Sequence, residues 1–273
     1  MRKLIRSQTA ERLKKLRTGL RHVARKQDDA DTIHDLRVSI RRFTQELRVF
    51  EPWFGSKTVK RIRRPLRRLM ERCGAVRNCD IAIDVLRTAG CADPELVAGL
   101  DRERRRTGQQ LAEEIEAWHK TDRIGKWRDR LKAGRAGSRE RADASARRLL
   151  PAILEDLFRA GRTAAQPDSS ARQMHRVRLK GKRVRYTLEL FKQAYGKKTE
   201  PMMNSLKVLQ EKLGAINDCA TTLEMIRRER AAATAVRRLC GERQAEFREY
   251  WKNHFRTQER LRWKAVLRAA DRN

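Results

Sequence analysis

The chain has 273 residues, of which 67 are Lys or Arg and 35 are Asp or Glu, so its formal net charge is +32. A charge of this size destabilises a compact monomer by self-repulsion and attracts polyanions, so the expected partner is nucleic acid, an anionic membrane or a phosphate polymer. No apolar run is long enough to span a bilayer, and the first residues lack the apolar segment of a secretory signal. The five cysteines form no Cys-x-x-Cys pair. A cytoplasmic protein with reduced thiols and without a metal or cofactor is therefore expected.

Apolar residues recur at helical spacing along almost the whole chain, and no segment alternates as a strand would, so the predicted fold class is all-α. Gly74 and Gly214 occupy positions typical of helix C-caps, and Asn78 and Asp218 are suited to N-cap the helices that follow. The predicted helices cover residues 2–27, 31–51, 56–73, 78–89, 94–119, 122–133, 138–163, 169–194, 199–213, 217–230 and 233–268.

The helix predicted over 31–51 illustrates the pattern that indicates a core face. Its apolar residues step by three or four positions, and the same steps recur in the second half of the chain. They are Ile33, Leu36, Ile40, Phe43, Leu47 and Phe50, matched by Met174, Val177, Val184, Leu188 and Phe191. Gly181 stands where Ile40 stands in the first half, and it either admits a close helix neighbour or marks a weak point.

Two motifs each occur twice, in the same order. His34-Asp-Leu-Arg37-Val-Ser-Ile-Arg41-Arg42 recurs 141 residues later as His175-Arg-Val-Arg178-Leu-Lys-Gly-Lys182-Arg183. Leu69-Met-Glu-Arg-Cys-Gly74-Ala-Val-Arg77-Asn78 recurs 140 residues later as Leu209-Gln-Glu-Lys-Leu-Gly214-Ala-Ile-Asn217-Asp218. These nearly equal offsets predict an internal duplication, with two helical bundles related by an approximate twofold. The expected organisation is one domain over 1–273, with halves 1–120 and 138–273 joined by a linker over 121–137, whose best candidate is the Gly-rich stretch from Lys132 to Ser138.

Basic residues of the first motif form a stripe beside the apolar face of each predicted helix. The members are separated by three, four or seven residues, and so share one side of the helix. They are His34, Arg37, Arg41 and Arg48 in the first copy and His175, Arg178, Lys182 and Arg185 in the second. Because like charges at this spacing repel, an external anion that relieves the repulsion is the favoured explanation. The alternative is salt bridging to acidic residues of a neighbouring helix.

The next predicted helix adds further candidates. Residues 57–72 carry a cation at nearly every position outside the core, whereas the second copy, 197–212, keeps only a few. Arg67 and its counterpart Lys207 are predicted to bind the anion, and Arg61, Arg63, Arg64 and Arg68 are interpreted as accessory charge. His34 and His175 either donate a hydrogen bond to the ligand or orient a neighbouring arginine.

The four motifs, in this order, resemble the CHAD domain (conserved histidine α-helical domain) over essentially the whole chain. The resemblance implies two four-helix-bundle-like halves around a basic central groove. It also implies binding of inorganic polyphosphate, which phosphate or sulfate can mimic, and in some members localisation to polyphosphate granules. The ligands that it implies here are His34, Arg37, Arg41, His175, Arg178, Lys182 and Arg185. Arg42 and Arg183 also match motif positions, although they lie about 80° round the helix from the histidines.

The expected protein is a stand-alone, non-catalytic polyphosphate-binding domain, since the chain lacks the Glu-x-Glu-x-Lys strand of the CYTH domain that often accompanies this family. Non-specific nucleic-acid binding at low salt is the main alternative, although aromatic residues make up only 5% of the chain and form no stacking platform. A metal-dependent phosphohydrolase, suggested by His34-Asp35, is disfavoured because Arg176 replaces the Asp in the second copy and cations surround the histidine.

Overall fold

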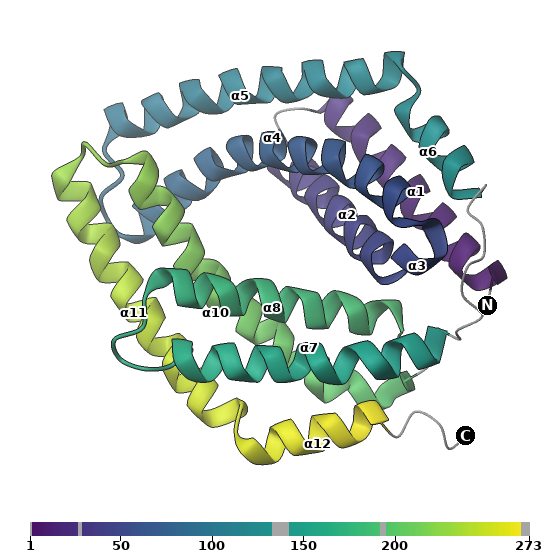
Figure 1. The fold of residues 1–273 in the computed structure, drawn as a ribbon. Helices are drawn as coiled ribbons and strands as arrows, with labels where there is room; N and C mark the ends of the chain where they lie inside the picture. The colour runs from purple at the N-terminus through teal and green to yellow at the C-terminus, as the bar shows by residue number, and fades with distance from the viewer. Residues whose placement is uncertain (1, 27–28, 133–141, 192–194, 269–273) are drawn as a thin grey trace. The chain divides into compact units, whose positions relative to one another are not determined.

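A computed structural model describes residues 2–26, 29–132, 142–191 and 195–268, and every regular element among them is helical (Figure 1). This confirms the all-α prediction. Contacts divide the chain into two compact units. Unit 1 comprises residues 1–84 and 92–139, and unit 2 comprises residues 85–91 and 140–273.

Unit 1 is built from α1 (Arg2–Arg25), α2 (Ala30–Val49), α3 (Glu51–Phe54), most of α4 (Ser56–Thr88), α5 (Pro94–Lys120) and α6 (Arg123–Lys132). Helix α1 packs along α2 and also contacts α5 and α6. Helices α4 and α5 run side by side (Figure 1), joined by a 2.6 Å hydrogen bond from Arg104 to Asp80. Asp29 and Asp93 begin α2 and α5, because their carboxylates accept hydrogen bonds from backbone N–H groups that lack a partner within the helix.

Unit 2 contains α7 (Ala142–Ala164), α8 (Ala171–Leu190), the short 3₁₀ helix η1 (Gly196–Thr199), α10 (Glu200–Met225), α11 (Arg230–His254) and α12 (Thr257–Arg268). A capping box between Ser170 and Gln173 begins α8. Helix α8 packs between α7 and α10, and α11 packs on α10. Helix α12 returns to α7, where Glu155 accepts hydrogen bonds from Arg260 at 3.0 Å and Lys264 at 2.8 Å.

The predicted core faces are confirmed. On α2, Ile33, Leu36, Ile40, Phe43 and Leu47 are at most 1% exposed, and their counterparts on α8 are also buried. Gly181 is buried too, but a methyl group there would lie 3.8 Å from Leu209 and 3.9 Å from Leu157, which are ordinary contacts. The close approach of a neighbouring helix therefore does not require this glycine.

The predicted breaks at Gly74 and Gly214 are wrong. Helix α4 runs without interruption from Ser56 to Thr88, and α10 runs from Glu200 to Met225, so Asn78 and Asp218 are not N-caps. Among the described residues, the glycines with positive φ are Gly55, Gly90 and Gly196. Gly74 and Gly214 keep helical backbone angles and so do not adopt the left-handed conformation of a C-cap.

The predicted single helix over 233–268 is also wrong, because the chain bends at Phe255 into α11 and α12. The ring of Phe255 stacks on Trp251 at 4.4 Å and meets Trp263 edge-on at 5.3 Å, so the bend closes an aromatic cluster.

In the predicted linker, residues 123–132 form α6, which packs on α1. Its candidate stretch after Lys132 lies outside the described residues.

A buried carboxyl between α1 and α2 predicts a pH-dependent stability. Glu46 accepts a hydrogen bond from Thr9, and Arg12 lies 3.6 Å from its second oxygen, yet burial raises the pKa of Glu46 to about 7. In the unfolded chain the Glu46 carboxyl loses its proton near pH 4.5, whereas in the folded chain it keeps the proton up to about pH 7. The folded state is therefore most stable, relative to the unfolded state, below pH 4.5, and it loses stability as the pH rises from there to about 7. The loss should amount to about 3 kcal/mol.

Chemical denaturation between pH 4.5 and 8 measures this effect. Glu46→Gln should flatten the dependence in that range, because the amide carries no charge at any pH and still accepts from Thr9. An unchanged profile in the variant would contradict a raised pKa at this site.

Candidate functional site

In unit 1 the first motif lies on α2, next to α4. His34 is exposed, whereas Arg37 and Arg41 are half-buried on the same side of the helix. Partial loss of water lowers the pKa of His34, and the guanidinium groups of Arg41 and Arg77 lower it further, although Asp35 opposes them. The structure therefore places the α4 residue Arg77 within electrostatic reach of the α2 stripe.

A glycine brings Arg37 close to the backbone of α4. A Cβ atom added at Gly74 would lie only 3.2 Å from Nη1 of Arg37. The same guanidinium acts on the buried thiol of Cys73, where it partly opposes the burial that raises the pKa of this cysteine to about 12. Gly74 thus has a role that differs from the predicted cap, because it leaves room for the arginine side chain of the neighbouring helix.

An acidic residue holds Arg77 in this position. Asp80 lies one turn further along α4, with Oδ2 3.6 Å from Nη1 of Arg77, and accepts a 2.6 Å hydrogen bond from Arg104 on α5. Both partners of the shorter contact are largely buried, with side-chain exposures of 14% and 12%. One carboxylate between two guanidinium groups leaves an excess of positive charge beside the motif.

In unit 2 the second motif lies on α8, next to α10. His175 Nδ1 is 2.9 Å from Oδ1 of Asn217, which stands at the position of Arg77 in the first copy. Arg178 and Lys182 are half-buried, like Arg37 and Arg41, whereas Arg183 is exposed. Each motif histidine therefore interacts with the same position of a neighbouring helix, electrostatically with Arg77 in unit 1 and through a direct contact with Asn217 in unit 2.

The other predicted residues differ in their surroundings. Arg185 is 3.4 Å from Glu189 and its guanidinium lies 5.2 Å from the ring centre of Tyr186, so part of its charge is already balanced. Arg67 is 83% exposed and pairs with Glu71 at 3.0 Å on its own helix. Arg42 is half-buried on α2, and Lys207 is exposed on α10.

A common spacing connects Arg67 and Lys207 to the motif residues. Two sets of four residues step by 3, 4 and 3 positions and so lie on one face of their helix. They are Arg67, Met70, Gly74 and Arg77 on α4, and Lys207, Gln210, Gly214 and Asn217 on α10. Arg67 lies about 10 Å along the axis from Gly74, so its charge extends the face that meets Arg37. The side-chain nitrogen of Gln210 is buried and has no hydrogen-bond partner among the described residues.

Three residues that the structure places beside the motif helices were not predicted as parts of the site, namely Arg77, Asn217 and Asp80. A signal was present in the sequence, because Arg77 and Asn217 hold equivalent places in the two copies of the second motif. Because a helix end was predicted at each glycine, the neighbouring residues Asn78 and Asp218 were interpreted as N-caps, and Arg77 and Asn217 were given no role.

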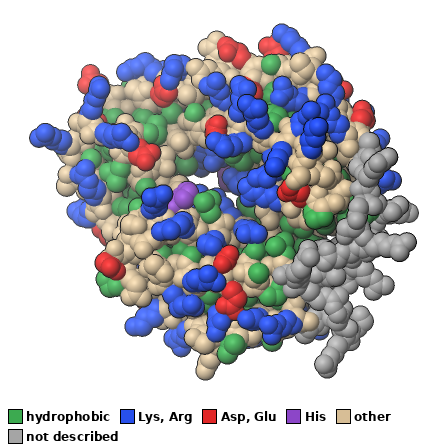
Figure 2. Space-filling model, in the orientation of Figure 1, with side chains coloured by type: hydrophobic (Ala, Val, Ile, Leu, Met, Phe, Trp, Pro, Cys, Tyr) green, Lys and Arg blue, Asp and Glu red, His purple; other side chains and the backbone are tan. Residues whose placement is uncertain are grey.

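Among the charged side chains visible in Figure 2, basic ones are more common than acidic ones. The exposed residues of the 57–72 segment contribute to this charge, and they include Lys57, Lys60, Arg61, Arg64 and Arg68. Among the described residues, no three His, Cys, Asp or Glu side chains form a group that could hold a metal ion. No described helix combines the length and apolar character needed to cross a membrane.

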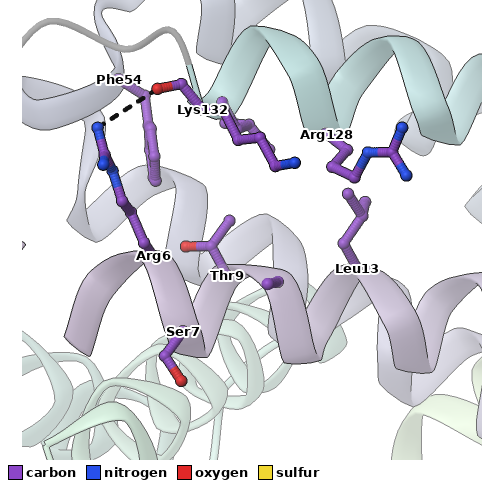
Figure 3. A pocket seen from close by; sticks show the side chains of 9 residues that line it. Arg6, Ser7, Thr9, Leu13, Phe54, Arg128 and Lys132 are labelled. Carbon is purple, nitrogen blue, oxygen red and sulfur yellow. Dashed lines mark hydrogen bonds between the residues drawn. The ribbon is translucent and has the colours of Figure 1, made fainter. Parts of the chain in front are cut away.

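A separate cavity of about 730 Å³ lies in unit 1 between α1, α3 and α6 (Figure 3). Leu13, Phe54 and Leu131 give it an apolar lining, and Arg6 closes one side through a 3.5 Å hydrogen bond to the backbone carbonyl of Lys132. None of the predicted anion-binding residues lines it, so this cavity is distinct from the motif site.

Comparisons with known proteins agree with this architecture. The crystal structure of the CHAD domain from the plant Ricinus communis aligns with 98% of this chain and 91% of its own, with a TM-score of 0.67 and 22% identity. PptA from Streptomyces chartreusis aligns with 96% of this chain and 97% of its own, with a TM-score of 0.59 and 16% identity. A comparison with curated proteins gave no significant match. The family model of the CHAD domain matches residues 7–227, and the chain therefore belongs to the CHAD domain family.

Proposed function

We propose that the chain binds inorganic polyphosphate without cleaving it, through the basic stripes of the two motif helices, α2 and α8. The observation that carries the proposal is the recurrence of one arrangement in both units. In each, a histidine and two half-buried cations follow one side of the motif helix, and the histidine interacts with the same position of the next long helix, through charge in unit 1 and through a direct contact in unit 2.

The chemistry of these stripes suits a linear polyanion. Polyphosphate carries about one negative charge per phosphate, and guanidinium groups bind phosphate oxygens through charge-assisted hydrogen bonds. Arg37, Arg41 and Arg77 lie near one another, and their mutual repulsion costs free energy that a bound phosphate recovers. Each unit thus supplies one basic stripe to the polymer.

The histidines have a smaller role in this proposal. The amide oxygen of Asn217 can only accept a hydrogen bond, so Nδ1 of His175 carries the proton in their contact. The neutral ring then has only an acceptor, Nε2, left for a ligand, and it contacts a phosphate oxygen favourably only when protonated. His34 is disfavoured as a cation by the guanidinium groups beside it. The arginines and Lys182 therefore supply most of the binding energy.

Salt dependence tests the proposal directly. The affinity for polyphosphate should fall steeply when it is titrated at salt concentrations from roughly 0.1 to 0.5 M, a range that includes physiological ionic strength. Each phosphate contact should make the slope of log K against log salt more negative by roughly one unit. Polyphosphate should also displace duplex DNA at physiological salt, and no orthophosphate should be released during the titration. Affinity that does not change with salt, or DNA that displaces polyphosphate, would contradict the proposal.

The protein would act in the cytoplasm, where polyphosphate granules offer the ligand at high local density. Fluorescence microscopy of the tagged chain, beside a granule stain, tests this location. A diffuse signal in cells rich in granules would argue against association with them.

Gly74 offers a prediction that separates stability from binding. Gly74→Ala should raise the free energy of unfolding by up to about 1 kcal/mol, because alanine is the better helix former, but should displace Arg37 and weaken polyphosphate binding about threefold. Gly214→Ala is the matched control, since nothing lies within 4 Å of a methyl group there. It should bring the same gain in stability and leave binding unchanged. Equal binding by both variants would show that Arg37 does not depend on Gly74.

A further inference from the structure

Two cysteines meet between neighbouring helices of unit 2. Cys219 on α10 is fully buried and Cys240 on α11 is 8% exposed. The adjacent α11 residues Arg243 and Gln244 contact one sulfur atom each, so the two thiol groups lie close enough to share a hydrogen bond. Neither residue belongs to the basic stripes. The two sulfur atoms are not bonded to each other in this structure.

Polar donors surround the two sulfur atoms. Nη1 of Arg243 lies 3.1 Å from Sγ of Cys219 and also donates a 3.1 Å hydrogen bond to the carbonyl of Ala215. Nε2 of Gln244 lies 3.5 Å from Sγ of Cys240. A guanidinium group fixed against a thiol pair stabilises negative charge on sulfur, which is the condition for a reactive cysteine.

The hydrogen bond between the thiols shifts the pKa values of the two cysteines in opposite directions. The pKa of Cys240 is lowered, chiefly because the thiol of Cys219 donates a hydrogen bond to its sulfur, and although burial opposes this shift, Gln244 and Arg243 add to it. The same hydrogen bond raises the pKa of Cys219, together with burial. The hydrogen bond thus favours a thiolate on Cys240 beside a protonated Cys219.

We propose that Cys219 and Cys240 are a peroxide-sensitive dithiol that closes to a disulfide between α10 and α11. The Cys240 thiolate attacks one oxygen of hydrogen peroxide, the O–O bond breaks, and the departing hydroxide takes up a proton to leave as water. The sulfur of Cys219 then attacks the sulfenic acid on Cys240, forming the S–S bond and releasing a second water. In total, two thiols lose two electrons and one peroxide is reduced to two waters.

Cys79 of unit 1 provides a comparison, because its surroundings disfavour the thiolate. Cys79 on α4 is 140 residues before Cys219, at the equivalent place in the second motif. Burial raises the pKa of Cys79 to about 11, and the carboxylates of Glu103 and Asp80 raise it further, outweighing Arg104. The two equivalent positions thus differ in the charge beside the sulfur, and only Cys219 has a thiol partner among the described residues.

Peptide mass spectrometry on the reduced full chain tests the proposal. After brief exposure to a few equivalents of hydrogen peroxide at pH 7, thiols are alkylated in denaturant. We expect a peptide pair joined through Cys219 and Cys240, lighter by two hydrogen atoms, formed at least about tenfold faster than any modification of Cys79. Cys79→Ser should leave the rate unchanged. First oxidation at Cys79, or alkylation of both Cys219 and Cys240 after treatment, would overturn the proposal.

The role of Arg243 is tested with a matched pair of variants. Arg243→Gln should slow disulfide formation about threefold or more, because the thiol pair loses the cation that contacts Cys219, whereas Arg237→Gln, on an exposed position of the same helix, should not. Circular dichroism confirms that both variants remain helical. Equal rates in the two variants would overturn the assigned chemistry.

Discussion

Removing four basic side chains from the motif helices should weaken polyphosphate binding at physiological salt by at least about 100-fold. This is less than the sum expected for four charge-assisted contacts at about 1.5 kcal/mol each, because other cations take over part of the binding. The replacements are Arg37→Ala, Arg41→Ala, Arg178→Ala and Lys182→Ala. Isothermal titration measures the loss. Helicity should be preserved, because alanine is a good helix former and the repulsion between the cations is removed.

A control variant with the same net charge distinguishes the loss of contacts at the motif site from a general loss of positive surface charge. Four exposed cations, again two from each unit, are replaced by alanine in a second variant. They are Arg61, Arg68, Arg237 and Arg238. This variant should lose only a fewfold in affinity, because exposed charges attract the polymer at long range without fixed contacts. Equal losses in the two variants would show that binding follows net charge alone.

Among the single substitutions considered, the largest loss of stability is expected at Gly161 of α7. A Cβ atom there would overlap the indole ring of Trp251, which is 4% exposed and held by Phe255 at 4.4 Å and Phe158 at 5.8 Å between ring centres. Because the ring has no free space to move into, Gly161→Ala should lower the free energy of unfolding by about 2–3 kcal/mol, despite the better helix propensity of alanine. Thermal unfolding should then occur roughly 5–10 °C lower.

Gly181→Ala is the matched control, since Gly181 is also a buried glycine within a helix of unit 2. A methyl group there meets Leu209 and Leu157 at ordinary contact distances, so the variant should be as stable as the natural chain or slightly more stable. A loss of stability at Gly161 no greater than at Gly181 would contradict the packing described around Trp251.

The sequence was sufficient to predict the helices and their core faces, because both depend on local periodicity. On α2, every apolar residue from Ile33 to Leu47 that recurs at helical spacing is buried. The ends of helices were harder to predict. Gly74 resembles a C-cap in sequence, but a cap needs positive φ, and the space beside Arg37 supplies another reason for a glycine. The bend at Phe255 follows from aromatic packing with α7, which no local pattern shows.

The candidate site was predicted in part. Periodicity placed Arg37 and Arg41 on one side of α2, beside the core. The partners Arg77 and Asn217 could not be assigned, because this requires knowing which faces of α4 and α10 meet the motif helices. The contact between Cys219 and Cys240 was beyond prediction for the same reason, since it depends on how α11 packs on α10.

The most direct test of the proposed function is a crystal structure of the chain with a short polyphosphate. It should show phosphate oxygens within hydrogen-bond distance of Arg37 and Arg41 on α2, and of Arg178 and Lys182 on α8. Phosphates bound only to the exposed cations of residues 57–72, with the motif helices unoccupied, would contradict it.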